Sequence, residues 1–340
     1  MKNMLVGLSL LMLTSACGSG SQTPQTDASV KTATKVIFDT DLGNDIDDVL
    51  ALQMLFNYEK AGKVDLLGIT VSKSTPNAIP FADGYCRFNN RGDIPLGFAY
   101  NGANPESGVY LDATLAAEVD GHKLISPKRS LSDSIPEGYI LLRQMLAEQP
   151  DSSVTLIAVG PLTNIARLLL SPSDTVSPLN GVDLVRQKVR LVSLMSGSFT
   201  GEYDFPEWNV VQDLPASRTV YELCPVPLIT SGFEIGMRLN YPHQSILNDF
   251  GNPDANPLCV AYQSYNPMPY DRQTWDLTAV LQAIDSDSAY FELSPRGTVT
   301  LDEKGYCQFT ESPDGLHQYF KIPTDSARVM QALIGRTTGK

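Results

Sequence analysis

The fold is decided by one stretch near the start of the chain, Val36-Ile37-Phe38-Asp39-Thr40-Asp41-Leu42-Gly43-Asn44-Asp45-Ile46-Asp47-Asp48. Its first three residues are β-branched or aromatic, which favours a short buried strand. Apolar residues then recur at helical spacing from Ile46 to Phe56. Ala61-Gly62-Lys63 supplies a helix stop, and a second apolar run follows at residues 64–71. The stretch therefore predicts a strand, an acidic loop, a helix and a second strand.

The same order of strand, loop and helix recurs further along the chain. Residues 154–159 are apolar and precede Gly160-Pro161-Leu162-Thr163-Asn164 and a second apolar stretch. Further strands are predicted at residues 189–195 and 226–230, each before a loop that contains glycine. This alternation predicts a single α/β domain with an open, mostly parallel sheet and helices on both faces. Ligands bind at the carboxyl ends of the strands in such sheets, so these loops are expected to converge.

The acidic loop spans ten residues and contains five carboxylates, namely Asp39, Asp41, Asp45, Asp47 and Asp48. Their mutual repulsion at the end of a buried strand would be costly without a cation. Carboxylate oxygens without interleaved His or Cys favour calcium or magnesium over zinc. A structural alternative is that the last three aspartates stabilise the N-terminus of the following helix, which would explain one or two of them.

Motifs in a fixed order give the chain a family resemblance. Asp41-Leu42-Gly43 with Asp47-Asp48 resembles the Asp-x-Asp-Pro-Gly-x-Asp-Asp signature of the inosine-uridine preferring nucleoside hydrolase family. Leu42 replaces the usual proline, and this loop is longer than the signature. Further blocks follow in family order, namely Gly160-Pro161-Leu162-Thr163-Asn164, Met195-Ser196-Gly197, Pro206-Glu207-Trp208-Asn209 and Trp275-Asp276. The resemblance implies a nucleoside hydrolase-like fold with a Rossmann-like core that carries calcium.

The resemblance also implies the residues that hold calcium. The protein ligands would be the carboxylates of Asp41, Asp48 and Asp276 and the main-chain carbonyl of Val159. A carbonyl ligand is indifferent to the side chain, so valine is no obstacle at that position. Asp276 has a structural alternative, because an aspartate before an apolar helical residue also suits a helix N-cap.

A ribose site beside the metal is implied by the same resemblance. Asp47 would hold ribose hydroxyls, Glu207 the 5′ end of the sugar, and Asn209 the 2′ or 3′ region. Met195 is also expected to contact the substrate. Taken singly, Asp47 is compatible with helix capping, and Glu207 and Asn209 with solvated loop positions. These structural alternatives do not explain why the blocks follow the family order.

Hydrolysis of an N-glycosidic bond requires an activated water, a hold on the sugar and help for the departing base. By the resemblance, a calcium-bound water is acidified by the cation, and Asp41 is the expected general base. Trp275 stands where many relatives carry histidine as the leaving-group acid. The purine-preferring branch of the family also has tryptophan there, so purine ribonucleosides and their salvage are expected. A core aromatic is the alternative for Trp275, and Trp208 is expected to pack rather than to contact substrate.

The composition favours a small ligand over a nucleic acid. The chain has 340 residues, of which 42% are hydrophobic and 19% charged, as in soluble globular proteins. Its formal net charge of −13 opposes binding to a polyanion. We therefore expect a small-molecule partner and no nucleic acid, and the resemblance implies that this partner is a nucleoside. The oligomeric state stays open, with a homo-oligomer among the alternatives.

The first residues resemble a bacterial lipoprotein leader. A basic start, an apolar run from Met4 to Leu13 and small residues before Cys17 predict residues 1–17 as a signal peptide with a lipobox cysteine. Residues 18–34 predict a flexible tether, and residues 35–340 the folded body. The expected product is exported and anchored to a membrane through a lipid on Cys17. It would face the periplasm of a Gram-negative bacterium, with the outer membrane as the expected address and a soluble periplasmic form as the alternative.

Two other functions stay open from the sequence. Hydrolysis of another N-ribosyl compound is compatible with the loop Ser72-Lys73-Ser74-Thr75-Pro76-Asn77, which lacks the Gly-Asn of many relatives. A non-catalytic lipoprotein that binds calcium or a ribosyl ligand would bind a nucleoside without turnover. The pairing of the remaining cysteines is also left open; they are Cys86, Cys224, Cys259 and Cys307.

Overall fold

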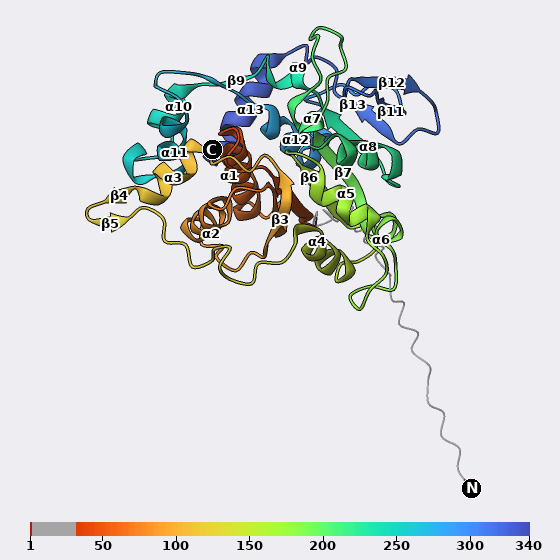
Figure 1. Cartoon of the computed structure of the whole chain (residues 1–340), viewed down its shortest axis with the longest axis horizontal. Coiled ribbons are helices and arrows are strands. Elements are labelled where there is room, and N and C mark those ends of the chain that lie inside the picture. Colours follow the sequence, from red (N-terminus) through yellow and green to blue (C-terminus); the bar gives the residue numbers. More distant parts are fainter. Residues whose placement is uncertain (2–31) are drawn as a thin grey trace. The chain divides into compact units, whose positions relative to one another are not determined.

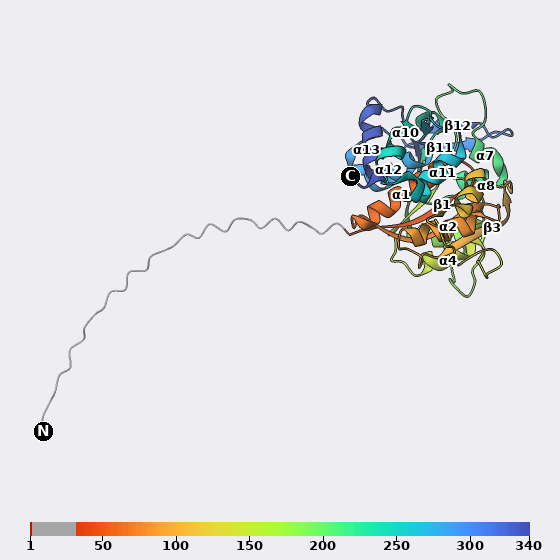
Figure 2. The same ribbon diagram turned by 90° about the vertical axis from the view of Figure 1, so that its left-hand side faces the viewer.

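The computed structural model describes Met1 and residues 32–340 (Figures 1 and 2). Most of the predicted leader, Cys17 and nearly all of the predicted tether lie outside the described residues. Residues Thr32–Lys340 form one compact unit, which agrees with the prediction of a single α/β domain. Within the described part of the chain, no helix combines the length and the apolar character that a membrane span needs.

A nine-stranded sheet forms the centre of the domain (Figure 1). Its strands are β1 (Thr34–Thr40), β2 (Val64–Lys73), β3 (Leu96–Ala103), β6 (Val154–Ala158), β7 (Val189–Met195), β8 (Leu228–Ser231), β11 (Gly297–Leu301), β12 (Cys307–Glu311) and β13 (His317–Tyr319). They lie in the order β12-β11-β13-β8-β7-β6-β1-β2-β3. All pairs from β13 to β3 are parallel, and β11 pairs antiparallel with both of its neighbours. The mostly parallel sheet predicted from the sequence is confirmed.

Helices cover both faces of this sheet. The α-helices are α1 (Asp47–Lys60), α2 (Ala78–Phe88), α3 (Val109–Ala116), α4 (Gly138–Ala147), α5 (Thr163–Leu170), α6 (Gly181–Lys188), α7 (Trp208–Gln212), α8 (Leu214–Leu223), α9 (Phe233–Gly236), α10 (His243–Asn248), α11 (Pro257–Tyr265), α12 (Trp275–Ile284) and α13 (Ser326–Thr338). Residues of α1, α12 and α13 share one apolar core, and residues of α4, α5, α6 and α8 share another. The smaller elements are the pairs β4 (Glu118–Val119) with β5 (His122–Lys123) and β9 (Asn240–Tyr241) with β10 (Arg272–Gln273), and the 3-10 turns η1 (Pro253–Ala255) and η2 (Ser286–Ser288).

Strand β1 separates these two cores. Val36 and Phe38 point into the core that contains α1 and α12, whereas Ile37 points into the core that contains α4 and α5. Alternate residues of a strand face opposite sides of a sheet, so a strand covered on both sides must be apolar throughout. Each of the three side chains is fully buried, and burial of one such side chain contributes about 2 kcal/mol. The short apolar run before the acidic loop is therefore the centre of the domain.

The helix that follows the acidic loop is tied to the last helix of the chain. The side-chain amide of Asn57, near the end of α1, donates to the carbonyls of Arg336 (3.1 Å) and Thr337 (2.7 Å). These carbonyls belong to the last turn of α13, where helices leave acceptors without partners. Asn57 therefore caps the end of α13 from α1.

The cysteines of the described residues are free thiols. Three of them are buried and Cys307 is partly buried; the buried ones are Cys86, Cys224 and Cys259. Burial raises the pKa of Cys224 to about 11 and that of the others to about 12. The structure thus pairs none of the cysteines that the sequence left open.

Candidate active site

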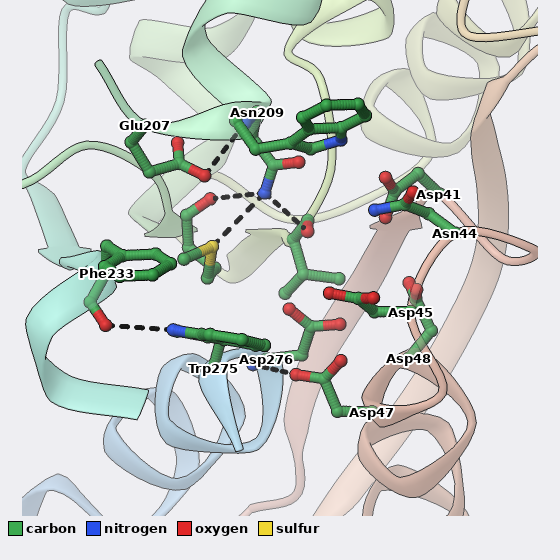
Figure 3. A pocket seen from close by; sticks show the side chains of 13 residues that line it. Asp41, Asn44, Asp45, Asp47, Asp48, Glu207, Asn209, Phe233, Trp275 and Asp276 are labelled. Atoms are coloured by element: carbon green, nitrogen blue, oxygen red, sulfur yellow. Dashed lines mark hydrogen bonds between the residues drawn. The ribbon is translucent and has the colours of Figure 1, made fainter. Parts of the chain in front are cut away.

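The loops at the carboxyl edge of the sheet line one cavity, as the strand order predicts (Figure 3). The acidic loop follows β1, Val159 follows β6, and the segment from Met195 follows β7. Every residue predicted from the sequence for metal or substrate binding lines this cavity. The full lining is Asp41, Asn44, Asp45, Asp47, Asp48, Val159, Met195, Glu207, Trp208, Asn209, Phe233, Trp275 and Asp276.

Glycines allow the acidic loop to pack closely. Gly43 has a φ of +104°, which favours glycine over every other residue. Gly108 lies directly on it, because a Cβ on Gly108 would be 2.1 Å from the Gly43 carbonyl oxygen. Gly160 lies against Asp41 in the same way, with its added Cβ 2.7 Å from the Asp41 Cβ. The first residue of the Gly160-Pro161-Leu162-Thr163-Asn164 block is therefore required by the position of Asp41.

Asp39 points away from the cavity and supports the loop from below. Its Oδ1 accepts hydrogen bonds from Thr70 Oγ1 (2.5 Å) and from Asn164 Nδ2 (2.8 Å). Burial raises the pKa of Asp39 to about 7, although both hydrogen bonds lower it. Asn164 closes the family block, so this block fixes both ends of the Asp39-Thr40-Asp41 segment.

Four carboxylates of the cavity are almost completely buried, namely Asp41, Asp47, Asp48 and Asp276. Burial is the largest cause of the raised pKa of each one. Neighbouring charges add to it: Asp45 raises the pKa of Asp41, and Asp47 raises that of Asp276. The pKa of Asp47 reaches about 7. The negative charge of these four carboxylates is therefore poorly compensated by the described residues.

The hydrogen bonds of these carboxylates satisfy only part of their oxygens. Asp47 Oδ2 accepts from the backbone N–H of Asp276 (3.1 Å), and Asp48 Oδ1 accepts from Thr40 Oγ1. Asp41 Oδ2, Asp47 Oδ1 and Asp48 Oδ2 are buried and have no hydrogen-bond partner among the described residues. Buried acceptors without partners are costly, and a ligand that supplies positive charge would remove that cost.

The donor chemistry of the cavity fits a hard divalent cation. Within residues 32–340, no three His, Cys, Asp or Glu side chains are already gathered as a metal-binding group. The unpartnered atoms are nevertheless carboxylate oxygens, and the cavity lining contains no thiol or imidazole. The Val159 carbonyl accepts from Asn209 Nδ2 at 3.1 Å and keeps a second lone pair. The assignment of Asp41, Asp48, Val159 and Asp276 as calcium ligands stays a prediction that this chemistry supports.

Glu207 and Asn209 are built into the wall and are not solvated loop residues. Glu207 is the N-cap of α7, and its carboxylate accepts from the backbone N–H groups of Asn209 (2.8 Å), Val210 (3.2 Å) and Gly197 (3.0 Å). Burial raises the pKa of Glu207 to about 7 against these hydrogen bonds. Asn209 Nδ2 donates to the carbonyls of Val159 (3.1 Å) and Met195 (3.3 Å) and so ties together the ends of β6 and β7.

Two tryptophans line the cavity from different elements. Trp275 begins α12, donates its indole N–H to the Phe233 carbonyl (2.9 Å) and stacks with the Phe233 ring at 5.4 Å. Gly236 is packed against the indole, since an added Cβ would be 2.3 Å from Trp275 Cδ1. Trp208 is 48% exposed and lines the cavity, so it does not pack in the core as the sequence suggested. Because Glu207 caps α7, the first residue of this helix projects from the core.

Arg272 and Tyr265 were not singled out from the sequence, although both hold the acidic loop. Arg272 Nη2 forms an ion pair with Asp45 Oδ2 (2.7 Å), and the Tyr265 hydroxyl donates to Asp45 Oδ1 (2.5 Å). The guanidinium lies 5.0 Å from the Tyr265 ring and 4.9 Å from the Trp275 ring. Sequence spacing gives no signal for these contacts, because Tyr265 lies 220 residues after Asp45.

Lys73 is a second cation beside the acidic loop. It ends β2 and is only 2% exposed. Burial lowers the pKa of Lys73, and the charges of Asp41, Glu106 and Asp48 oppose this effect. The sequence indicated that the loop from Ser72 to Asn77 differs from that of many relatives. It did not indicate that Lys73 of this loop interacts with Asp41. Lys73 and Arg272 together leave most of the carboxylate charge without compensation.

Comparison with known proteins agrees with the fold and with this site. Residues 36–314 match the family model described as inosine-uridine preferring nucleoside hydrolase. A parallel α/β sheet with a carboxylate-lined cavity at its carboxyl edge, together with this match, defines an N-glycosyl hydrolase. The chain belongs to the inosine-uridine preferring nucleoside hydrolase family. The resemblance inferred from the motifs is confirmed.

Characterised relatives and solved structures extend the comparison. The chain is 30% identical over 233 residues to the non-specific ribonucleoside hydrolase RihC of Salmonella typhimurium, covering 64% of this chain and 65% of the relative. It is 27% identical over 236 residues to the pyrimidine-specific ribonucleoside hydrolase RihA of Shewanella oneidensis, covering 66% and 67%. The structure of the purine-preferring ribonucleoside hydrolase from Gardnerella vaginalis matches with a TM-score of 0.66 at 15% identity, covering 90% of this chain and 98% of that one. This structural likeness supports the fold.

Proposed function

We propose that the protein hydrolyses the N-glycosidic bond of ribonucleosides, with purine nucleosides as preferred substrates and calcium as the required metal. One observation carries this proposal. Asp41, Asp47, Asp48 and Asp276 line one cavity together with Glu207, so a concentrated negative charge faces the residues predicted to hold a ribose. A cavity of this kind is suited to an oxocarbenium-like transition state, which carries positive charge on the sugar.

The metal site supports the proposed chemistry. Asp41, Asp48, Asp276 and the Val159 carbonyl would hold calcium, which supplies Lewis acidity and a template for oxygen ligands. Asp41 is the proposed general base, because its Oδ2 is buried without a hydrogen-bond partner among the described residues. It would accept a proton from the water that attacks the anomeric carbon while the bond from that carbon to the base nitrogen breaks.

The sugar is held by residues whose positions are already fixed. Asp47 has a free Oδ1 that can accept from ribose hydroxyls. Glu207 is held by three backbone N–H groups and would accept from the 5′ end of the sugar. Asn209 is held through its amide nitrogen, which leaves its amide oxygen for the 2′ or 3′ region. Such fixed side chains lower the cost of orienting the substrate.

The departing base would lie against aromatic side chains. Trp208 and Trp275 both line the cavity, and Phe233 stacks on Trp275. Flat side chains favour a purine because it offers a larger ring surface than a pyrimidine. No histidine of the described part of the chain lines the cavity, so the base would take its proton from solvent while the indoles hold it. The proposed purine preference would distinguish this protein from its pyrimidine-specific relative.

A panel of nucleosides tests the proposal. The purified body, from residue 32, is incubated with inosine, adenosine, uridine and cytidine, with calcium or with excess chelator. Ribose release that requires calcium and is fastest with the purines is the expected result. Nucleoside that binds without cleavage would refute hydrolysis and favour a ribosyl-binding protein. Hydrolysis that survives exhaustive chelation would refute the metal requirement.

We also propose that the enzyme works outside the cytoplasm, anchored through a lipid on Cys17. The leader-like residues 1–17 support this proposal. Expression of the full chain and of Cys17→Ala in a Gram-negative host, followed by membrane fractionation, tests the anchor. The unchanged chain is expected in the membrane fraction and the variant in the soluble periplasmic fraction. The same distribution for both proteins would contradict lipidation.

A further inference from the structure

A second cavity lies behind Glu207, and nothing in the proposed chemistry uses it. It is formed by the loop that follows β7 and by the turn that joins β11 to β12. Its volume is about 180 Å³, compared with about 60 Å³ for the space between the carboxylates and Glu207. Glu207 lines both cavities, so they adjoin at the residue proposed to hold the 5′ end of the ribose.

An aromatic wall connects the two cavities. Phe233 lines the first cavity, and its ring lies 5.0 Å from each of the rings of Tyr203 and Phe205, which line the second. Phe199 lines the second cavity from the same loop and is stacked at 4.7 Å on Tyr319 of β13. Aromatic rings therefore continue past Glu207 into the second cavity, where Phe199 packs against the sheet and Tyr203 and Phe205 pack against Phe233.

The second cavity carries no positive charge. Among residues 32–340, its lining contains no lysine, arginine or histidine, and Glu207 contributes a carboxylate. The Ser198 hydroxyl is buried without a hydrogen-bond partner among the described residues and is a neutral donor. Arg238 pairs with Glu202 at 2.6 Å and is not part of the lining. A phosphate would thus be repelled by the Glu207 carboxylate, and a neutral group that packs against the aromatic rings of the lining would be accepted.

We propose that this cavity binds a neutral, apolar substituent on the 5′ carbon of the substrate, so that 5′-alkylthio ribonucleosides are preferred to 5′-phosphorylated ones. This inference rests on the proposed function, because it uses the sugar orientation in which the 5′ end meets Glu207. The reaction is unchanged: water adds to the anomeric carbon, the bond to the base breaks, and the base leaves with a proton. The products are the free base and a 5′-substituted ribose.

The volume of the second cavity decides which substituents fit. An apolar cavity of about 150 Å³ accommodates a benzene molecule. The cavity of about 180 Å³ behind Glu207 therefore has room for a short alkylthio group. One methylene in an apolar pocket changes selectivity by roughly tenfold or more. A substituent of two or three heavy atoms should thus produce a measurable preference.

Competition between three purine ribonucleosides tests the proposal. Adenosine, 5′-methylthioadenosine and adenosine 5′-phosphate are compared by base release, in calcium, using the whole folded body. The kcat/KM for the methylthio compound is expected to exceed that of the phosphate by roughly tenfold or more, the smallest change assigned to one apolar group. A phosphate that is cleaved as well as the methylthio compound would overturn the proposal.

Variants separate the second cavity from the active site. Ser198→Leu fills the cavity and is expected to lower the ratio of kcat/KM for methylthioadenosine to that for adenosine by roughly tenfold. Thr300→Leu, on the exposed side of β11, is the matched control and should leave this ratio unchanged. Tyr306 lines the second cavity from the turn between β11 and β12. Tyr306→Ala should lower the same ratio, and it replaces Ser198→Leu if that protein does not fold.

The outcomes distinguish this inference from the function on which it rests. If adenosine is hydrolysed and neither variant changes the ratio, the second cavity is not a 5′ subsite although the enzyme is a nucleoside hydrolase. If no nucleoside is hydrolysed, the proposed function is wrong, and calorimetry with the same three compounds then tests the cavity by binding alone. Equal affinity for the three compounds would overturn the subsite in that case.

Discussion

Removal of the proposed calcium ion is expected to destabilise the folded protein more at neutral pH than at acid pH. Asp41, Asp47, Asp48 and Asp276 are buried together, and burial raises the pKa of each. Without a cation, the folded state holds protons on these carboxyls at pH values where the unfolded chain has released them. The free energy of unfolding of the calcium-free protein therefore falls as the pH rises from about 4 to about 7.

Asp47 gives the magnitude of this effect. Its pKa rises from 3.8 in the unfolded chain to about 7 in the folded one. A difference of about three pKa units corresponds to about 4 kcal/mol, which is lost between these two pH values. Calcium at a hundred times its dissociation constant would restore about 2.7 kcal/mol. At about 2 °C for each kcal/mol, the Tm should rise by roughly 5 °C on calcium addition at pH 7.5.

Thermal unfolding of the body in calcium and in chelator, at several pH values from 4.5 to 8, measures this difference. The gap between the two Tm curves should open with rising pH, and it should nearly close at pH 4.5, where protons occupy the carboxyls. Magnesium at equal concentration serves as the comparison metal. Parallel curves at all pH values would refute the view that the metal compensates the buried carboxylate charge.

Three substitutions examine the site residue by residue. Asp41→Asn should lower kcat for inosine by about a thousandfold, the scale of general base catalysis, and retain nucleoside binding in calorimetry; a smaller loss of kcat would remove Asp41 from that role. Arg272→Met removes the ion pair of Asp45, which keeps only the hydrogen bond from Tyr265, and should cost about 2–3 kcal/mol in urea unfolding, with Arg272→Lys recovering part of it; equal stability of the three proteins would contradict the pairing. Trp208→Ala should lower kcat/KM for inosine about tenfold through lost stacking, whereas Trp208→Phe should retain most of it; an unchanged value in Trp208→Ala would exclude contact with the base.

The central parallel strands β1, β2, β6, β7 and β8 were predictable because they are mostly buried apolar runs, whereas the parallel strands β3 and β13 were not predicted. Strand β7 covers Val189–Met195, the residues predicted, and β1 extends the predicted run at each end to Thr34–Thr40. The segments β11 and β12 were not predicted, because exposed polar residues interrupt their apolar positions. They pair antiparallel at the edge of the sheet, where burial imposes a weaker pattern.

The residues of the site were predictable where they follow strands. Asp41 and Val159 directly follow β1 and β6, and Met195 ends the neighbouring β7, so their convergence follows from the topology of a parallel sheet. Arg272 reaches Asp45 only through the packing of distant elements, and no local pattern encodes that contact. The exposure of Trp208 depends on the cap that Glu207 makes, which the sequence alone does not reveal. Contacts between distant parts of the chain thus determine site features that the periodicity of the sequence does not reveal.

The hydrogen bonds from Asn57 couple the position of α1 to the end of α13. The helix begins with Asp47 and Asp48 in the cavity, and Asn57, about 15 Å further along its axis, holds the last turn of α13. Any event that separates α13 from α1, such as proteolysis after Asp325 or a bulky fusion beyond Lys340, would act on this far end. Because α1 is a continuous helix, the resulting displacement would also move the carboxylates of Asp47 and Asp48 in the cavity. Displacement of α13 is therefore expected to alter the active site from a distance.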